Sequence, residues 1–221
     1  MFITKVKSNL LVLSLTLFLI SCGDTTGNKG SLFIPRKLLE SHTYPFKQRF
    51  DEVVIGNQTW MKYYLITTKF RNGDLISHCQ SNQEWVDAYN SKTPAWCYYG
   101  KTPSPMGLLY NKFAIYDKRG LAPQGYHLPS EKEIIELSYF FKHNWHDGSE
   151  NESYNESLVY EPFFKHFLGG RNDDGTFFGA KELTLWATSN DSLTMTVDSA
   201  NTMLPFGGVS GGGHYIRCIK N

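Results

Sequence analysis

The chain has 221 residues, of which 22 are Lys or Arg and 21 are Asp or Glu, and its net charge is +1. This near-neutral balance, without a basic stripe, gives no electrostatic basis for nucleic-acid binding. Aromatic residues make up 15% of the chain and glycine occurs 19 times, which indicates a compact domain with many turns and a core filled by large rings.

Residues 1–21 have the pattern of a bacterial lipoprotein signal peptide. Lys5 and Lys7 precede an apolar run over residues 10–20, and Cys22 follows a small residue. These features define a signal peptide, and the run is shorter than the roughly 20 apolar residues that a membrane-spanning helix needs. We therefore expect cleavage before Cys22, which leaves 20 basic against 21 acidic residues.

Cys22 is the expected lipidation site, with fatty chains such as palmitate on its sulfur and its new amino group. Each buried methylene contributes about 0.8 kcal/mol, and two or more chains anchor a protein stably. The sequence therefore predicts a lipid-anchored protein of the cell envelope, at the outer membrane. An ordinary cleavage site with an unmodified Cys22 is the less favoured alternative, because Leu19 and Ser21 suit the lipoprotein pattern.

The segment 22–50 is predicted to separate the lipid from a single domain over residues 51–221. Residues 23–30 are polar and rich in glycine, which is typical of a flexible tether, and residues 31–50 form a lead-in. The domain begins with a predicted hairpin, in which strands at 53–55 and 59–61 flank a Gly-Asn turn.

Three helices are predicted along the domain. Ser81 with Glu84, and Ser130 with Glu133, each fit a capping box, which predicts helices to about residue 89 and over residues 131–142. A third helix is expected over residues 158–168, stopped by Gly169-Gly170.

Short strands are predicted between and after these helices. Two lie in a proline-rich looped region at 95–99 and 108–110, and others follow near the end of the chain at 176–178, 183–188, 193–197 and 214–219. Helices in the middle and strands toward the end favour an α+β fold over an alternating parallel one.

Three cysteines remain besides Cys22, namely Cys79, Cys97 and Cys218. An exported compartment permits disulfides, and three thiols allow one intramolecular bridge. Spacing alone does not choose the pair.

Five motifs together resemble the Fibrobacter succinogenes major paralogous domain family over residues 51–221. They are Ile55-Gly56-Asn57-Gln58-Thr59-Trp60-Met61, Phe70-Arg71-Asn72-Gly73-Asp74, Ala95-Trp96-Cys97-Tyr98-Tyr99, Gly120-Leu121-Ala122-Pro123 with His127-Leu128-Pro129-Ser130, and Ile216-Arg217-Cys218-Ile219-Lys220. The resemblance implies a C-type lectin-like fold with a twisted, mostly antiparallel sheet, two to three short helices, long loops, and paired first and last strands. It also implies a lipid-anchored or secreted protein without enzymatic activity. The chain departs from the family pattern at Ile134-Ile135, where a tryptophan is usual.

The resemblance adds one disulfide possibility, because Cys97 and Cys218 match family positions. Cys79 and Cys97 are near neighbours in sequence, and we favour a bridge between these two, with Cys218 as a buried thiol. A Cys97–Cys218 bridge is the alternative.

A C-type lectin-like fold suggests calcium as a possible cofactor. Candidate oxygen ligands come from Asp173, Asp174 and Asp191. The sugar-binding signature of calcium-dependent lectins is absent, however, and residues 171–175 are more simply a turn with Asx chemistry. We therefore expect no cofactor.

Aromatic residues in looped or polar surroundings are candidates for stacking on a ligand: Trp96, Tyr98, Tyr99 and Trp145. Core filling is the competing and more frequent role for such rings. No catalytic residue is predicted, because no Gly-x-Ser-x-Gly elbow precedes a helix, and His143 with His146 fits a solvated surface better than a zinc site. The expected function is binding of a glycan or an envelope protein. A non-catalytic scaffold or assembly role is the alternative, and an enzyme is the least favoured possibility.

Overall fold

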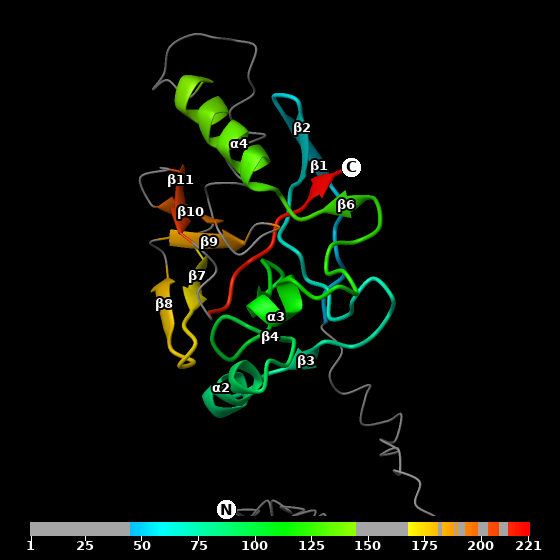
Figure 1. Ribbon diagram of the computed structural model, residues 1–221, viewed down its shortest axis with the longest axis vertical. Coiled ribbons are helices and arrows are strands. Elements are labelled where there is room, and N and C mark those ends of the chain that lie inside the picture. The colour runs from blue at the N-terminus through cyan, green and yellow to red at the C-terminus, as the bar shows by residue number, and fades with distance from the viewer. Residues whose placement is uncertain are drawn as a thin grey trace, which may run out of the picture. The chain divides into compact units, whose positions relative to one another are not determined.

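The computed structural model describes residues 45–144, 168–180, 183–187, 189, 193–198, 203–207 and 212–221 (Figure 1). The predicted signal peptide, Cys22 and most of the lead-in lie outside these residues, as do Trp145, Asp191 and the predicted helix up to residue 167. In the part of the chain that the structure describes, no helix is both long and apolar enough to cross a membrane.

The predicted hairpin opens a sheet that also holds the end of the chain. Its strands, in spatial order, are β1 (Glu52–Ile55), β2 (Gln58–Met61), β12 (Ile219–Lys220) and β6 (Tyr126–His127), and their pairings are antiparallel. The hairpin turn uses Gly56 at φ +58°, a conformation that glycine adopts without strain. The last strand pairs with β2 and not with the first strand, contrary to what the resemblance implied. In the strand order, Trp60 of β2 pairs with Val53 on one side and with Ile219 on the other, so β2 separates the first strand from the last.

A second, small sheet holds the two strands predicted in the looped region. It contains β3 (Ser77–His78), β4 (Ala95–Cys97) and β5 (Leu109–Tyr110), with β4 in the middle, parallel to β3 and antiparallel to β5. All three residues of β4 are buried.

Two of the predicted helices are confirmed, together with their caps. They are α2 (Asn82–Asn90) and α4 (Glu131–Asn144). In α2 the Ser81 hydroxyl accepts from the Glu84 N–H, but the Glu84 carboxylate accepts from the N–H of Gln80, one residue before the cap. The buried face of α4 contains Ile134, Leu137 and Phe141, which recur at helical spacing. A further short helix, α3 (Lys112–Ile115), was not predicted and begins after an Asn111 cap.

The late strands form the third sheet. In spatial order they are β11 (Met203–Gly207), β10 (Leu193–Asp198), β9 (Leu183–Ala187), β7 (Leu168–Arg171) and β8 (Phe177–Ala180). Gly169-Gly170 was predicted to stop a helix, but both residues lie in β7. Of the strand predicted over 214–219, only Ile219 lies in β12 (Ile219–Lys220), and His214 forms an isolated bridge with Tyr110. The strand β11 was not predicted, because it contains Pro205 and proline argues against a strand. In the described sheet, however, β11 lies at the edge, where a residue without an N–H is tolerated.

The mixture of short helices and mainly antiparallel sheets confirms an α+β class. Two buried clusters form the core, one around Trp60 and Trp85 and the other around Trp96 and Tyr110. The high aromatic content of the sequence is therefore used chiefly to fill the interior.

Candidate functional site

The most enclosed of the described pockets lies between the start of α2, the loop after β4, and the β7–β8 hairpin. We call it the Arg171 pocket, and its volume is about 510 Å³. Side chains that line it include those of His78, Gln80, Asn82, Tyr98, Lys101 and Phe177, together with Arg171. Lys101 in the loop after β4 and Arg171 in the β7–β8 hairpin are 70 residues apart in sequence, so only the fold brings these groups together.

Arg171 holds this pocket together. It is the last residue of β7 and only 3% exposed. Its Nε donates to the Gly175 carbonyl at 3.0 Å, and its Nη2 donates to the Asn82 side chain at 2.8 Å and to the Ser81 carbonyl at 3.2 Å. The planar fork of donors on one arginine thus joins the β7–β8 turn to the beginning of α2.

Two aromatic rings hold the Arg171 guanidinium in place. Its central carbon lies 4.8 Å from the centre of the Trp85 ring and 4.7 Å from that of Phe177. Such cation–π contacts contribute about 0.5–2 kcal/mol each, more when they are desolvated. The indole N–H of Trp85 also donates to the Asn172 carbonyl at 3.0 Å, so the hairpin is tied to α2 twice.

The calcium candidates that the structure describes lie in the turn of this hairpin. Asp173 and Asp174 are exposed, and the Asp174 carboxylate accepts from the hydroxyl and the N–H of Thr176 at 2.6 and 2.8 Å. These hydrogen bonds lower the pKa of Asp174. Among the described residues, no group of three His, Cys, Asp or Glu is placed to hold a metal ion. The two carboxylates make the local turn contacts typical of Asx residues.

The aromatic residues predicted to face a ligand have different surroundings. Tyr98 is half-buried and lines the Arg171 pocket. Tyr99 lies behind it, with its ring 4.9 Å from Phe177 and its hydroxyl donating to the Phe178 carbonyl. Trp96 is only 1% exposed, so the prediction that it faces a ligand is wrong in this structure.

Trp96 is held in the core by its position in β4. Its ring stacks on His78 at 3.9 Å with nearly parallel planes, and its indole N–H donates to the Ile76 carbonyl at 3.1 Å. The central strand of the small sheet is covered on both faces, which leaves this large ring no route to the surface.

Cys79, Cys97 and Cys218 are free thiols, and all three are buried. Cys79 lines the Arg171 pocket, while Cys97 lies behind it against Arg171. Burial raises the pKa of Cys79 to about 11 and that of Cys97 to about 12, although the Arg171 charge lowers the second in part. At neutral pH only a small fraction of the Cys79 and Cys97 side chains is ionised, so neither thiol is an activated nucleophile.

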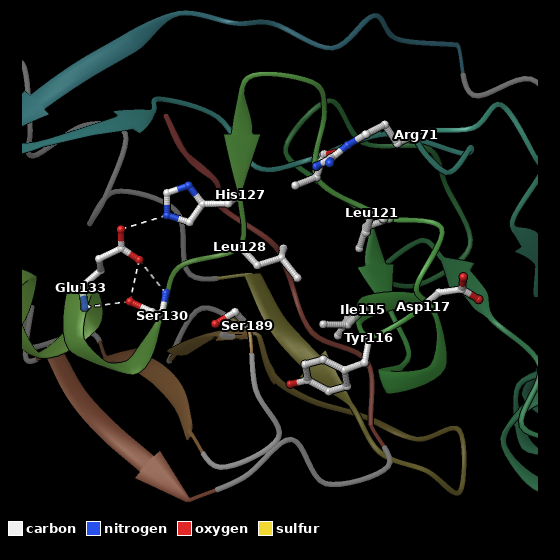
Figure 2. Close-up of a pocket in the computed structure, with 12 residues that line it drawn as sticks. Arg71, Ile115, Tyr116, Asp117, Leu121, His127, Leu128, Ser130, Glu133 and Ser189 are labelled. Atoms are coloured by element: carbon white, nitrogen blue, oxygen red, sulfur yellow. Dashed lines mark hydrogen bonds and ion pairs between the residues drawn. The ribbon is translucent and has the colours of Figure 1, made fainter. Parts of the chain in front are cut away.

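A second pocket, which we call the His127 pocket, is lined by the family motifs that precede α4. Its volume is about 630 Å³. Figure 2 shows Glu133 reaching toward both His127 and Ser130. The Glu133 Oε1 lies 2.9 Å from the His127 Nε2, and the Glu133 Oε2 accepts from the hydroxyl and the N–H of Ser130, both at 2.7 Å.

This arrangement resembles a serine–histidine–acid set in composition but not in connectivity. The Ser130 hydroxyl donates to Glu133, whereas a catalytic serine would donate to a histidine that acts as its base. The His127 Nδ1 lies 2.9 Å from the side-chain oxygen of Asn221. The three residues therefore cap α4 and tie it to the end of the chain.

Arg71, at the far side of the His127 pocket, also has a structural role (Figure 2). Its guanidinium donates to the Ala122 carbonyl at 2.9 and 3.1 Å and to the Tyr126 carbonyl at 3.3 Å. The motif residues around this pocket thus hold one another, and we take the more enclosed Arg171 pocket as the candidate ligand site.

Sequence reasoning found Tyr98 and the 171–175 turn separately but missed Arg171, Lys101 and His78. No local pattern marks them, since a single basic residue before a turn is common on a solvated surface. Their shared location follows from the packing of β7–β8 against α2.

Comparison with known proteins gives one match. The family model of the Fibrobacter succinogenes major domain matches residues 53–220, close to the 51–221 expected from the motifs. No protein of curated function and no solved structure matches the chain. Because the family model spans most of the sequence, from β1 to β12, the chain belongs to the Fibrobacter succinogenes major domain family.

Proposed function

We propose that this protein is a lipid-anchored component of the bacterial envelope whose C-type lectin-like domain binds a glycan in the Arg171 pocket. The lipid anchor is inferred from the signal pattern that ends at Cys22. In this proposal the domain binds its glycan ligand and catalyses no reaction.

The observation that carries the proposal is the lining of the Arg171 pocket. It combines aromatic surface from Tyr98 and Phe177 with the amide groups of Gln80 and Asn82. Ligand sites typically pair apolar surface with a few well-placed polar groups, and amides can both donate to and accept from hydroxyls. A sugar offers the matching chemistry, with an apolar ring face bordered by hydroxyl groups.

The packing beneath the pocket supports recognition by a preformed site. Arg171, Trp85 and Phe177 are fixed by the contacts described above, and the Asn82 side chain is held by Arg171. A site whose groups are already positioned loses less conformational entropy when a ligand binds.

The test is binding of the full-length protein, kept in detergent, to a glycan array. The variant Tyr98→Ala should lose about threefold to tenfold in affinity, because an aromatic contact contributes roughly 0.5–1.5 kcal/mol. Tyr139→Ala is the matched control, since Tyr139 is 58% exposed on α4 and does not line the pocket. Thermal melting of each variant checks that the fold is kept.

An envelope scaffold is the competing function, and the same material separates the two. If no sugar on the array binds specifically, and if the protein cross-links to one envelope protein both as wild type and as Tyr98→Ala, the function is assembly and not glycan recognition. Sugar binding that is equally strong in the Tyr98 and Tyr139 variants would show that the ligand site lies elsewhere.

A further inference from the structure

The Arg171 pocket has a marked imbalance of charge. Arg171 and Lys101 both line it, beside His78, while no Asp or Glu of the described residues does. The chain as a whole is nearly neutral, so this local excess of positive charge is a feature of the pocket and not of the composition.

Among the residues that the structure describes, the charge of Arg171 meets only neutral hydrogen-bond partners. Its hydrogen bonds go to two carbonyl oxygens and one amide oxygen, and no ion pair joins it to a carboxylate in the described part of the chain. A cation with 3% exposure is costly to bury unless an opposite charge compensates it. An anionic group in the pocket would supply that compensation.

The described carboxylates of the hairpin turn and of the α2 cap are directed to other groups. Asp173 accepts from the Asp174 N–H at 3.0 Å, Asp174 accepts from Thr176, and Glu84 accepts from the Gln80 N–H at 2.6 Å. None of the three lines the pocket. Among the described residues, then, no carboxylate matches Arg171 and Lys101, and an anionic group of a ligand would do so.

We propose that the ligand is an acidic glycan that carries a uronic-acid carboxylate, an inference that rests on the proposed glycan-binding function. Its carboxylate pairs with the exposed Lys101 ammonium and is attracted by the positive charge of Arg171, whose Nε and Nη2 donors already bind Gly175, Ser81 and Asn82. Its ring stacks against the exposed part of Tyr98 and Phe177, and its hydroxyls reach Gln80 and Asn82. An isolated small anion would use only the first of these contacts.

The test compares oligogalacturonate with the same oligomer after methyl esterification, which removes the negative charges and keeps the sugar rings. The full-length protein in detergent should bind the acid form about tenfold or more tightly than the ester, because a hydrogen bond to a charged group contributes roughly 1.5–3 kcal/mol. Rising sodium chloride should weaken binding of the acid form more than that of the ester.

Lys101→Gln is the informative variant, because Lys101 is exposed and its loss leaves the core intact. It should lower the affinity for the acid form by roughly threefold, as expected for one partly screened charge pair, and should not change binding of the ester. Lys118→Gln is the control, since Lys118 is an exposed lysine outside the pocket lining. It should behave like the wild type with both ligands.

Equal affinity for the acid and ester forms would overturn the acidic-glycan inference and leave glycan binding standing. Acetate that binds as tightly as oligogalacturonate would also overturn it, because the pocket would then be a simple anion site. Binding of neutral sugars on the array, without binding of oligogalacturonate or its methyl ester, would also overturn the acidic-glycan inference. If the protein binds no sugar on the array at all, the proposed glycan-binding function itself is wrong.

Discussion

At the scale of single residues, two buried arginines hold distant segments together. Arg171 joins the β7–β8 turn to α2, and Arg217, 1% exposed, donates to the Lys62 carbonyl at 2.7 Å while its guanidinium lies over the Tyr64 ring. Burial lowers the pKa of Arg217. Each arginine offers several donors in one plane, which suits loops whose carbonyls have no regular strand partner.

A first prediction concerns Glu133 and pH. Burial by itself raises the pKa of Glu133, but hydrogen bonds from Ser130 and His127 outweigh it, and the net shift is downward. A folded-state pKa below the unfolded one means that the carboxylate stabilises the fold above about pH 4.3 and that this contribution is lost as pH falls through the lower, folded value.

Glu133→Gln should therefore lower the free energy of unfolding by roughly 1 kcal/mol at neutral pH, the usual size of a lost cap interaction. The difference from wild type should shrink as pH falls below about 4. Thermal melts across pH measure it, with Glu131→Gln in the same helical turn as the control. A difference that stays constant down to about pH 3 would contradict the assigned role of the charge.

A second prediction compares two glycines that both have positive φ. A Cβ at Gly107 would lie 2.8 Å from a Tyr215 ring carbon and 2.9 Å from the Tyr64 Cβ, whereas a Cβ at Gly73 meets nothing within 4 Å. Gly73→Ala should cost about 1–2 kcal/mol for backbone strain alone. Gly107→Ala should cost roughly 1–3 kcal/mol more, because it also overpacks the core.

Chemical denaturation of both glycine variants measures these costs. Equal destabilisation would contradict this account, because it would mean that the Tyr215 ring and the Tyr64 Cβ move aside at no cost.

At the scale of elements, the capped helices and the first hairpin were the most predictable parts. Ser81 and Ser130 each begin a helix as expected, because capping depends on residues three positions apart. By contrast, β3 and β12 have two residues each, too few to show a periodic pattern. Their existence depends on partners far away in the chain.

The pairing of β3 with β4 bears on the disulfide alternatives. Ser77 aligns with Ala95, and His78 aligns with Trp96. The Cys79 N–H also donates to the Trp96 carbonyl. If the same register continues by one residue, Cys79 lies beside Cys97. Cys79 and Cys97 belong to the same core cluster, whereas Cys218 belongs to the other. This geometry favours Cys79–Cys97 over Cys97–Cys218 as a prediction for the oxidised protein.

Refolding with oxidised glutathione should form that bridge. Two thiols are oxidised, and the glutathione disulfide accepts their two electrons and becomes two thiols. Intact mass should show the loss of two hydrogen atoms in wild type and Cys218→Ala, but not in Cys97→Ala or Cys79→Ala. A bridge that persists in Cys79→Ala would establish the alternative pairing with Cys218.

At the scale of the whole molecule, the predicted lipid anchor and the proposed ligand binding would together place recognition at a membrane surface. The expected test is Cys22→Ala, which should abolish palmitate labelling and move the protein from the membrane to the soluble fraction, since the fatty chains supply the membrane affinity. Cys218→Ala should leave both properties unchanged. Labelling that persists in the Cys22 variant would contradict the predicted anchor.

Sequence patterns were sufficient to predict the family, the α+β class, the two helices with capping boxes and the hairpin turn at Gly56. These features depend on local spacing and turn chemistry, which act between residues a few positions apart. Only the tertiary structure decided that Trp96 is buried, that the last strand lies beside β2, and that Arg171 meets Tyr98 and Lys101 in one pocket. Those outcomes depend on which distant surfaces exclude water together, and no local pattern records that choice.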